Sequence, residues 1–592
     1  MLRASPHFRG TSELSVEHAM QRSRLAVLLF LPLALATGCP APQCQGTACD
    51  GSDAGVDAGV DSGTVDTGDF AATGPYANCH FIQGTTGTLC GELGSFDLSA
   101  CQLPTLGGVG QEGVFTTLGR IDQNDGGVRY FTQSHSLRND GGVETFNGWA
   151  TLSSNMSLTK QFDNDTWFVS RHTTSRLADG GTINVTVGYA GCSAQDTNHF
   201  TGCYAVCRNG ESSEVGTFKA ARIVPARNES EANGLTLVSE TPVVDQYDSS
   251  YFYGLPVDVY VTKSHAYVVS LESAYQGWGG LSVYDVSDPA HPRLVNQISA
   301  ENGYWNGVWA KGDALYVASG KHGVITFDIS NPANPVLTPV QVQENVDAHT
   351  VLVEGNHLYA MGDPTRIYDI SNPRAPRLLG RYVPPGAESY PYAYVHDAFV
   401  YQGRMYSYYW SYGMQISDVS RLSDTQGPTP LGAYRYAVNA DGSPMLSHAR
   451  SHAGAVGTYV DRLIAFEGGE GWGAHLRVLD VTDPTQVKLI SRYRLREEAS
   501  IHNMILDEAR KRLYIAYYQE GVRVLDVANP AQPREIGYFN TFRSEDPMRG
   551  LGFYEGAIGI RVPKTPDVSS ANAGLLYVVD TSRGLMILRE TK

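Results

Sequence analysis

Residues 369–380 read DISNPRAPRLLG, and closely similar phrases recur along the second half of the chain. They start at Asp285 (DVSDPAHPRLVN), Asp328 (DISNPANPVLTP), Asp480 (DVTDPTQVKLIS) and Asp526 (DVANPAQPREIG). An Asp ends each apolar stretch, and Asp-Pro, Asn-Pro or a similar pair follows. Asp and Ser side chains bond nearby backbone N–H groups and Pro favours turns, so each phrase predicts a strand, a turn and a second strand.

Four short strands are expected in each repeat from about residue 234 onward. In one repeat they are HTVLVEG, NHLYAMG, TRIYDISNP and PRLLGRYV. Four strands per repeat, at spacings of 41 to 62 residues, are typical of the blades of a β-propeller. We assign the ends of the third strands to seven aspartates and therefore predict seven blades: Asp285, Asp328, Asp369, Asp418, Asp480, Asp526 and Asp580.

The two ends of the repeat region are incomplete in complementary ways. The last copy, GLLYVVDTSRGLMILRE, stops before a fourth strand, and GLTLVSETPV at 234–243 precedes the first full copy. We expect 234–243 to supply the fourth strand of the last blade and so to close the ring.

The third-strand phrases VRVLDV, LRVLDV, LSVYDV and VITFDI resemble the LVIVD repeat, a propeller family of exported bacterial proteins. The resemblance covers about residues 234–592. The resemblance implies the propeller fold. It says little about function, because the family has no enzymatic activity in common.

The chain begins with features of an export signal, and Met20 is the more plausible start. Arg22 and Arg24 precede an apolar run, Leu25–Ala36, that is too short to span a bilayer. LALATGC, ending at Cys39, resembles the lipobox of bacterial lipoproteins, which implies acylation of Cys39 after removal of 1–38. Pro40 favours the outer membrane or the cell surface. The alternative is an ordinary signal peptide with Cys39 in a disulfide.

Residues 39–70 are predicted to form a tether. The part at 50–69, DGSDAGVDAGVDSGTVDTGD, has too little apolar surface to fold by itself, and its carboxylates repel one another. A calcium-binding Asp repeat is the alternative, because calcium prefers oxygen ligands.

Residues 71–232 are predicted to form a small antiparallel β domain stapled by disulfides, followed by the propeller at 233–592. Alternating stretches such as TWFVSRHTTSRL and TINVTVGYAG indicate strands, and NDGGV and ADGGT indicate hairpin turns. Cys44 and Cys49 form a natural local pair, while the pairing of the other six stays open. The candidate disulfide cysteines all precede residue 208: Cys44, Cys49, Cys79, Cys90, Cys101, Cys192, Cys203 and Cys207.

Aligning the predicted blades places a histidine at one position of four consecutive blades, namely His349, His396, His452 and His502, with Asn306 there in blade two. The position lies where the first strand enters the central channel, so the imidazoles can converge on one mouth. Imidazole is a common ligand of zinc, copper and iron. The alternative is a repeated histidine that bonds the backbone of its own blade. Glu344, Asp347, Asp397 and Arg450 are candidates to complete a polar pocket.

Aromatic residues are expected on the same face, in loops between strands. Exposed rings next to glycines suit stacking on a sugar or a peptide, and packing between blades is the alternative. The candidates are Tyr304, Trp305, Trp278, Trp410 and Trp472.

Composition and motifs argue against several classes of function and leave three hypotheses. The net charge of −17, with no basic run, argues against nucleic acid. No nucleophile elbow, zinc-protease motif or phosphate-binding loop is present, so we assign no catalytic residue. The first hypothesis is a lipid-anchored envelope protein whose propeller binds a protein or glycan. The second is a metal-dependent hydrolase or oxidoreductase using the histidine-lined channel, with zinc, copper, iron or calcium as the possible ion. A third makes the disulfide domain the recognition module.

Overall fold

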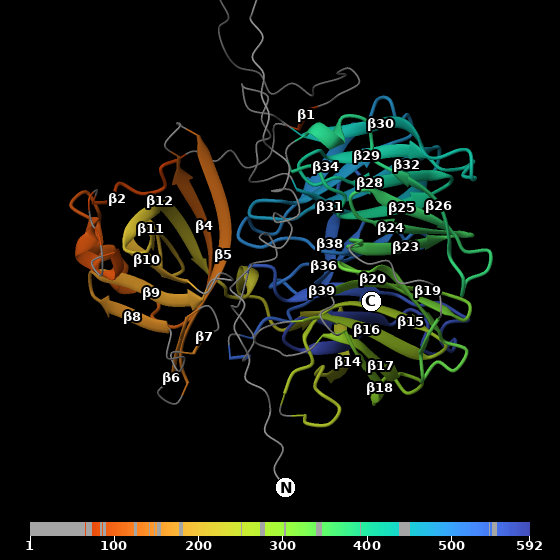
Figure 1. Cartoon of the computed structure of the whole chain (residues 1–592), viewed down its shortest axis with the longest axis horizontal. Coiled ribbons are helices and arrows are strands. Elements are labelled where there is room, and N and C mark those ends of the chain that lie inside the picture. Colours follow the sequence, from red (N-terminus) through yellow and green to blue (C-terminus); the bar gives the residue numbers. More distant parts are fainter. Residues whose placement is uncertain are drawn as a thin grey trace, which may run out of the picture.

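The computed structural model places a β domain beside a propeller (Figure 1). It describes residues 65–66, 74–82, 84, 86, 90–123, 127–140, 143–146, 149–150, 156–176, 181–249, 251–272, 279–300, 304–338, 346–390, 392–436, 450–543, 545–546 and 553–591. The predicted signal peptide, most of the tether, and the candidates Cys39, Cys44, Cys49, Trp278 and Glu344 lie outside the described residues.

Seven four-stranded antiparallel sheets form the propeller, as predicted. Blade one holds β15 (Leu255–Thr262), β16 (His265–Leu271), β17 (Gly280–Asp285) and β18 (Arg293–Ser299). Blade two holds β19 (Trp305–Lys311), β20 (Ala314–Ser319), β21 (Gly323–Asp328) and β22 (Val336–Leu337). Blade three holds β23 (Thr350–Glu354), β24 (His357–Met361), β25 (Thr365–Asp369) and β26 (Arg377–Tyr382). Blade four holds β27 (Asp397–Tyr401), β28 (Arg404–Tyr408), β29 (Met414–Asp418) and β30 (Thr429–Tyr436).

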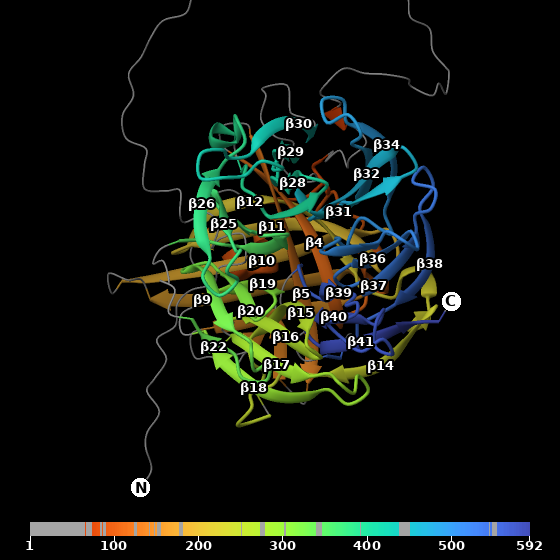
Figure 2. The ribbon, with the colours of Figure 1, turned by 90° about the vertical axis from the view of Figure 1, so that its right-hand side faces the viewer.

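The remaining blades complete the ring. Blade five holds β31 (Ser451–Tyr459), β32 (Arg462–Gly469), β33 (Leu476–Asp480) and β34 (Lys488–Tyr493). Blade six holds β35 (Met504–Asp507), β36 (Arg512–Ala516), β37 (Val522–Asp526) and β38 (Arg534–Phe539), with β13 (Ala232–Asn233) added outside β38. Blade seven holds β39 (Ala557–Arg561), β40 (Leu576–Asp580), β41 (Gly584–Glu590) and β14 (Leu235–Thr241). The first strand of each blade is innermost, and neighbouring inner strands are in contact around the ring, including β39 with β15 (Figure 2).

The predicted closure of the ring is confirmed. β14 pairs antiparallel with β41, with Leu237 opposite Leu588, and supplies the outermost strand of blade seven. Glu240 of β14 accepts a hydrogen bond from Arg583 Nε at 2.9 Å and lies within 3.4 Å of Arg543. The Arg583 side chain is buried, so the junction is held by charge as well as by the backbone ladder.

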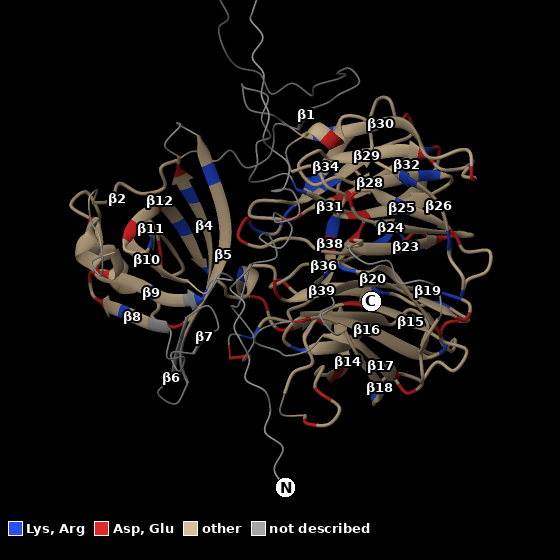
Figure 3. Cartoon of the chain, viewed as in Figure 1, with Lys and Arg blue, Asp and Glu red and all other residues tan. Residues whose placement is uncertain are grey.

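The repeated aspartates close turns. In all seven copies the Asp Oδ1 accepts the backbone N–H two residues further on, at 2.8 to 3.0 Å. Six of them end the third strand of a blade. The assignment of Asp580 is wrong: it ends β40, the second strand, because blade seven makes its Asp turn between β40 and β41. In Figure 3 the acidic residues lie mainly near strand ends, where these turns are.

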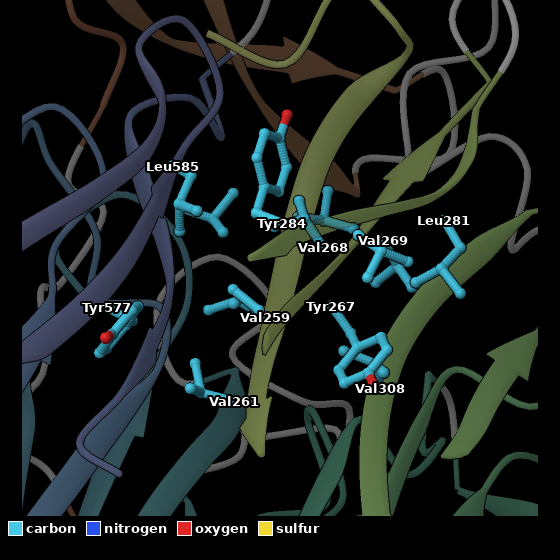
Figure 4. Packing of buried hydrophobic residues seen from close by; sticks show 14 of the residues in the cluster. Val259, Val261, Tyr267, Val268, Val269, Leu281, Tyr284, Val308, Tyr577 and Leu585 are labelled. Atoms are coloured by element: carbon cyan, nitrogen blue, oxygen red, sulfur yellow. The ribbon is translucent and has the colours of Figure 1, made fainter. Parts of the chain in front are cut away.

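Adjacent blades stack face to face, so their middle strands are buried on both sides. Val268 and Val269 are neighbours in β16 and both are fully buried. Val259 and Tyr267 pack between Tyr577 and Leu585 of blade seven and Val308 of blade two (Figure 4). Near-continuous apolar strands of this kind are required when both faces of a sheet are covered.

The N-terminal domain is one curved antiparallel sheet, and its predicted class is confirmed. Its long strands are β4 (Gly113–Asp122), β5 (Val128–Asp140), β8 (Met156–Asp163), β9 (Thr166–Arg176), β10 (Thr182–Ala194), β11 (His199–Arg208) and β12 (Glu211–Arg222), extended at one edge by β6 (Val143–Phe146) and β7 (Trp149–Ala150). A segment with β2 (His80–Phe81), η3 (Leu93–Ser95) and β3 (Phe96–Asp97) packs on one face of β9 to β11. The following η4 (Leu103–Gly108) places Leu106 in the cluster on the other face. Disulfides staple this part of the chain to the sheet through the pairs Cys79–Cys203, Cys90–Cys207 and Cys101–Cys192.

Two residues of the predicted tether join the propeller. β1 (Val65–Asp66) pairs in parallel with β30 of blade four. The outer strand of a blade has free backbone groups along its edge, and a passing extended segment can pair with them.

Candidate functional site

The structure brings the four histidines into one contiguous row. His349 and His396 directly precede β23 and β27, His452 lies in β31, and His502 lies two residues before β35. Ring centroids are 4.1 Å apart for His349 and His396, 3.8 Å for His396 and His452, and 4.4 Å for His452 and His502. Equivalent positions of consecutive inner strands therefore meet at one level of the channel, and the row is here called the histidine cluster.

Asn306 extends the histidine cluster into blade two. Its Nδ2 lies 3.1 Å from His349 Nε2. Val257 and Ile558 occupy the places in blades one and seven, and both are buried apolar side chains. The polar part of the row thus belongs to blades two to six.

Backbone carbonyls fix the protonated nitrogen of two imidazoles. His452 Nδ1 lies 3.2 Å from the carbonyl oxygen of His502, and His502 Nδ1 lies 2.8 Å from that of Ile558. A carbonyl oxygen only accepts, so Nδ1 carries the hydrogen in both rings. In the neutral form, Nε2 of each ring therefore has a free lone pair.

Burial keeps the imidazoles of the histidine cluster uncharged. It lowers the pKa of His349 to about 4 and that of His502 to about 3. The pKa values of His396 and His452 lie well below the ordinary value, first because of burial and then because neighbouring imidazoles repel a second charge.

Glu470 and Tyr518 belong to the site and were not predicted from the sequence. The Glu470 carboxylate follows β32, and its Oε1 lies 3.8 Å from His452 Nε2. Tyr518 donates its hydroxyl hydrogen to Glu470 Oε1, and its ring lies edge-on to His502 at 5.0 Å. His396, His452 and Glu470 each offer one ligand atom, and these atoms lie within 4.8 Å of one another.

The aromatic candidates do not form an exposed binding face. Trp305, Trp410 and Trp472 are all buried. Trp410 stacks on His396 with centroids 5.4 Å apart and planes at 16°, and Tyr304 stacks on His349 at 6.3 Å. Trp305 packs against Phe327 in the core instead. Two of the rings therefore hold the imidazoles in place.

The N-terminal domain packs over this mouth of the channel, which explains the burial of Trp472. Trp472 and Phe553 of the propeller pack with Leu118 of β4 and Ala221 of β12. The Lys219 ammonium lies 2.5 Å from the Glu497 carboxylate and 5.2 Å from the Trp472 ring. The predicted face is thus occupied by the chain itself.

Nearer the channel, a short chain of polar groups joins the two domains. Arg450, which lies 5.1 Å from the Trp410 ring, donates to the Tyr554 hydroxyl at 2.6 Å. That hydroxyl lies 3.4 Å from Thr132 Oγ1 of β5. Arg450 therefore lies between the histidine cluster and the N-terminal domain.

The other predicted polar residues lie around the histidine cluster. Thr350 donates to the carbonyl of His396 at 3.0 Å and lies 3.1 Å from Asp397 Oδ1. Burial raises the pKa of Asp397 to about 7 and that of Asp347 to about 6. Asp397 and Thr350 therefore support the backbone that carries His396.

Segments that match a known protein family coincide with blades of the propeller. The LVIVD repeat model matches residues 257–299, 302–339, 347–383 and 512–541, which fall on blades one, two, three and six. No curated protein matches the chain. Among solved structures, one chain of a "Crystal Structure of Mitotic Checkpoint Complex" is 11% identical with a TM-score of 0.39, covering 62% of this chain and 98% of its own. The computationally designed Ika8 protein is 9% identical with a TM-score of 0.36, covering 60% of this chain and 100% of its own. The seven blades and the four matched segments together identify the chain as an LVIVD-repeat β-propeller protein.

Proposed function

We propose that this is an exported binding protein whose ligand site is the histidine cluster, at the channel mouth that the N-terminal domain covers. The observation that carries the proposal is the convergence of four imidazoles from four blades in one buried row. The binding role remains the one expected from the sequence, but its place is the covered channel mouth rather than an open aromatic face.

The energetics of the histidine cluster favour a ligand site over a structural role. His396 and His452 are only 4% and 1% exposed, yet His396 Nδ1 and His452 Nε2 have no hydrogen-bond partner among the residues that the structure describes. A buried polar atom without a partner costs about 1–3 kcal/mol. A ligand that bonds these nitrogens removes that cost.

Replacing both residues in a His396→Leu/His452→Leu variant is expected to change the free energy of unfolding by less than about 1 kcal/mol, because removing two unsatisfied nitrogens offsets the loss of the contacts with the His502 carbonyl and with His349. Urea unfolding of the full chain in the presence of a chelator measures this. His265→Leu serves as the control, since His265 Nδ1 bonds the Lys263 carbonyl at 2.8 Å outside the cluster and its loss is expected to destabilise. A loss above about 2 kcal/mol in the double variant would show that the histidines serve folding.

We also infer that Cys39 is acylated and anchors the protein to the outer membrane or the cell surface. The support is the resemblance of LALATGC to a lipobox and the basic and apolar segments before it. Two or more acyl chains hold a protein stably on a bilayer. Among the described residues, no helix is long and apolar enough to cross a membrane.

Binding of a glycan partner is a second candidate function, and it is favoured by one loop. Tyr247 and Tyr251, between β14 and β15, are 90% and 66% exposed. Hydrogen bonds hold the start of this loop: Asp245 Oδ1 accepts the backbone N–H of Tyr247 at 2.8 Å, and Gln297 Oε1 accepts that of Gln246 at 2.7 Å. Two rings presented rigidly beside carboxylates suit stacking on a sugar.

One set of proteins tests the anchor and the glycan surface together. Wild type is expected in the membrane fraction and to bind immobilised cell-wall glycans. Cys39→Ser is expected in the soluble fraction with glycan binding intact. Tyr247→Ser/Tyr251→Ser is expected to remain in the membrane fraction and to bind at least about tenfold more weakly. Membrane retention of Cys39→Ser, or full binding by the tyrosine variant, would contradict the respective inference.

A further inference from the structure

We propose that the histidine cluster binds one divalent transition-metal ion through His396 Nδ1, His452 Nε2 and the Glu470 carboxylate. This inference rests on the proposed function, because it names the ligand of the same site. The three ligand atoms come from blades four and five and are all buried.

The contact between His452 and Glu470 suits a bound cation. Because His452 Nδ1 donates to a carbonyl, its Nε2 presents a lone pair, and Glu470 Oε1 faces it at 3.8 Å. Glu470 already accepts the Tyr518 hydrogen, so this hydrogen is not available to His452. A lone pair and a carboxylate that face each other in a buried site are both stabilised by a cation bound between them.

The orientation of the rings is that of metal ligands. A ligating histidine usually donates its other ring N–H to a carbonyl or carboxylate, which fixes the tautomer and raises the basicity of the ligating nitrogen. His452 does so through the His502 carbonyl. His396 reaches the same state if its Nε2–H donates to His349 Nε2, 2.9 Å away, because its partnerless Nδ1 is then the bare nitrogen.

The site needs only small movements to close on an ion. Ligand atoms about 2 Å from one metal lie roughly 3 Å apart, whereas one ligand atom from each of the three residues lies within 4.8 Å of the other two. Trp410, stacked on His396, and Tyr518, bonded to Glu470, hold two of the ligands on either side of His452. Side-chain rotations on a fixed backbone are therefore enough.

The donor set selects the class of metal. Two imidazoles with one carboxylate suit zinc or ferrous iron and leave coordination positions open for water or a small ligand. Calcium takes six to eight oxygen ligands and is a poor match. His502 flanks the triad, and the lone pair of its Nε2 can accept a hydrogen bond from a water in an open position, which is the arrangement that a metal-dependent enzyme would need.

The test uses the full chain in detergent, stripped with a chelator and then dialysed. Zn²⁺ is titrated by calorimetry and Co²⁺ by visible absorption, whose intensity reports low-coordinate nitrogen and oxygen ligation. We expect about one ion per chain for wild type. Affinity is expected to fall at least about 100-fold in His396→Leu/His452→Leu and roughly 10- to 100-fold in Glu470→Gln. His357→Gln, at a half-buried histidine of β24, and the exposed Glu388→Gln are the matched controls and should bind like wild type.

Wild type that takes up neither Zn²⁺ nor Co²⁺ would overturn the proposal, as would unchanged affinity in the double variant. These results are distinct from failure of the proposed function, which the chelator unfolding experiment decides. If the double variant is as stable as wild type and no metal binds, the ligand site stands and the metal is rejected. If it is strongly destabilised, the ligand site itself is rejected.

Discussion

Replacing Arg477 by methionine is expected to lower the free energy of unfolding by about 3–5 kcal/mol, because it leaves the Glu467 carboxylate buried without its cation. Both side chains are completely buried, with Arg477 Nη1 3.1 Å from Glu467 Oε2. Tyr436 also donates to Glu467, and the guanidinium lies 4.6 Å from the Tyr436 ring. Denaturant unfolding of the full chain measures the loss.

Two further variants distinguish the effect of the unpaired buried carboxylate from a general loss of packing. Arg477→Met/Glu467→Gln removes both charges and is expected to regain most of the stability, since a buried ion pair contributes little over a neutral pair. Arg374→Met breaks the surface pair with Asp328, 2.7 Å apart, and is expected to cost much less, because water and salt screen an exposed ion pair. If Arg477→Met costs no more than Arg374→Met, the buried pair does not carry the stability assigned to it.

The N-terminal domain is expected to lose stability in mild acid through His135. Burial, and then the nearby Arg171 charge, lowers the pKa of this imidazole to about 3. The ring packs on Tyr189 with centroids 4.5 Å apart. The folded state keeps the ring neutral while the unfolded state takes up a proton below pH 6.5, so stability is lost as pH falls from about 6.5 towards 3.

The size of this loss of stability follows from the lowered pKa of His135. Each pH unit below 6.5 costs about 1.4 kcal/mol, so about 3 kcal/mol is lost by pH 4.5. His135→Leu removes the titrating group and is expected to lose that much less between pH 7.5 and pH 4.5. Urea unfolding at pH 7.5 and pH 4.5 gives the change in the free energy of unfolding for wild type and for the variant. The contribution of the channel histidines is the same in both proteins and drops out of the comparison. Equal losses in the two proteins would contradict the assignment.

The sequence predicted the propeller because its repeat is local. Each Asp turn is made within three residues, so the phrase around Asp369 defines a strand end without knowledge of the rest of the fold. The same reasoning misassigned Asp580, whose identical turn to Ser582 follows the second strand of its blade. A local signal fixes a turn, whereas its place among the four strands depends on pairing with distant residues.

The site could be predicted only as far as it follows the repeat. The four histidines occupy one repeated position, and the regular stacking of blades brings repeated positions together. Glu470 and Tyr518 occur once, in loops, so no periodic signal marks them. The burial of Trp472 depends on Leu118 and Ala221, which belong to strands of another domain. Docking between domains leaves no pattern in either sequence segment.

The closure of blade seven has a consequence for how the protein is made. β14 is synthesised before every complete blade, but its partner β41 is synthesised after the other six. The pairing is among the most distant in the chain, so ring formation is slow compared with the folding of one blade. In that interval the edge of β14 and the faces of unfinished blades can pair with other chains. Once formed, the seven blades share a single seam, and the lifetime of the folded ring depends on how rarely β14 and β41 separate.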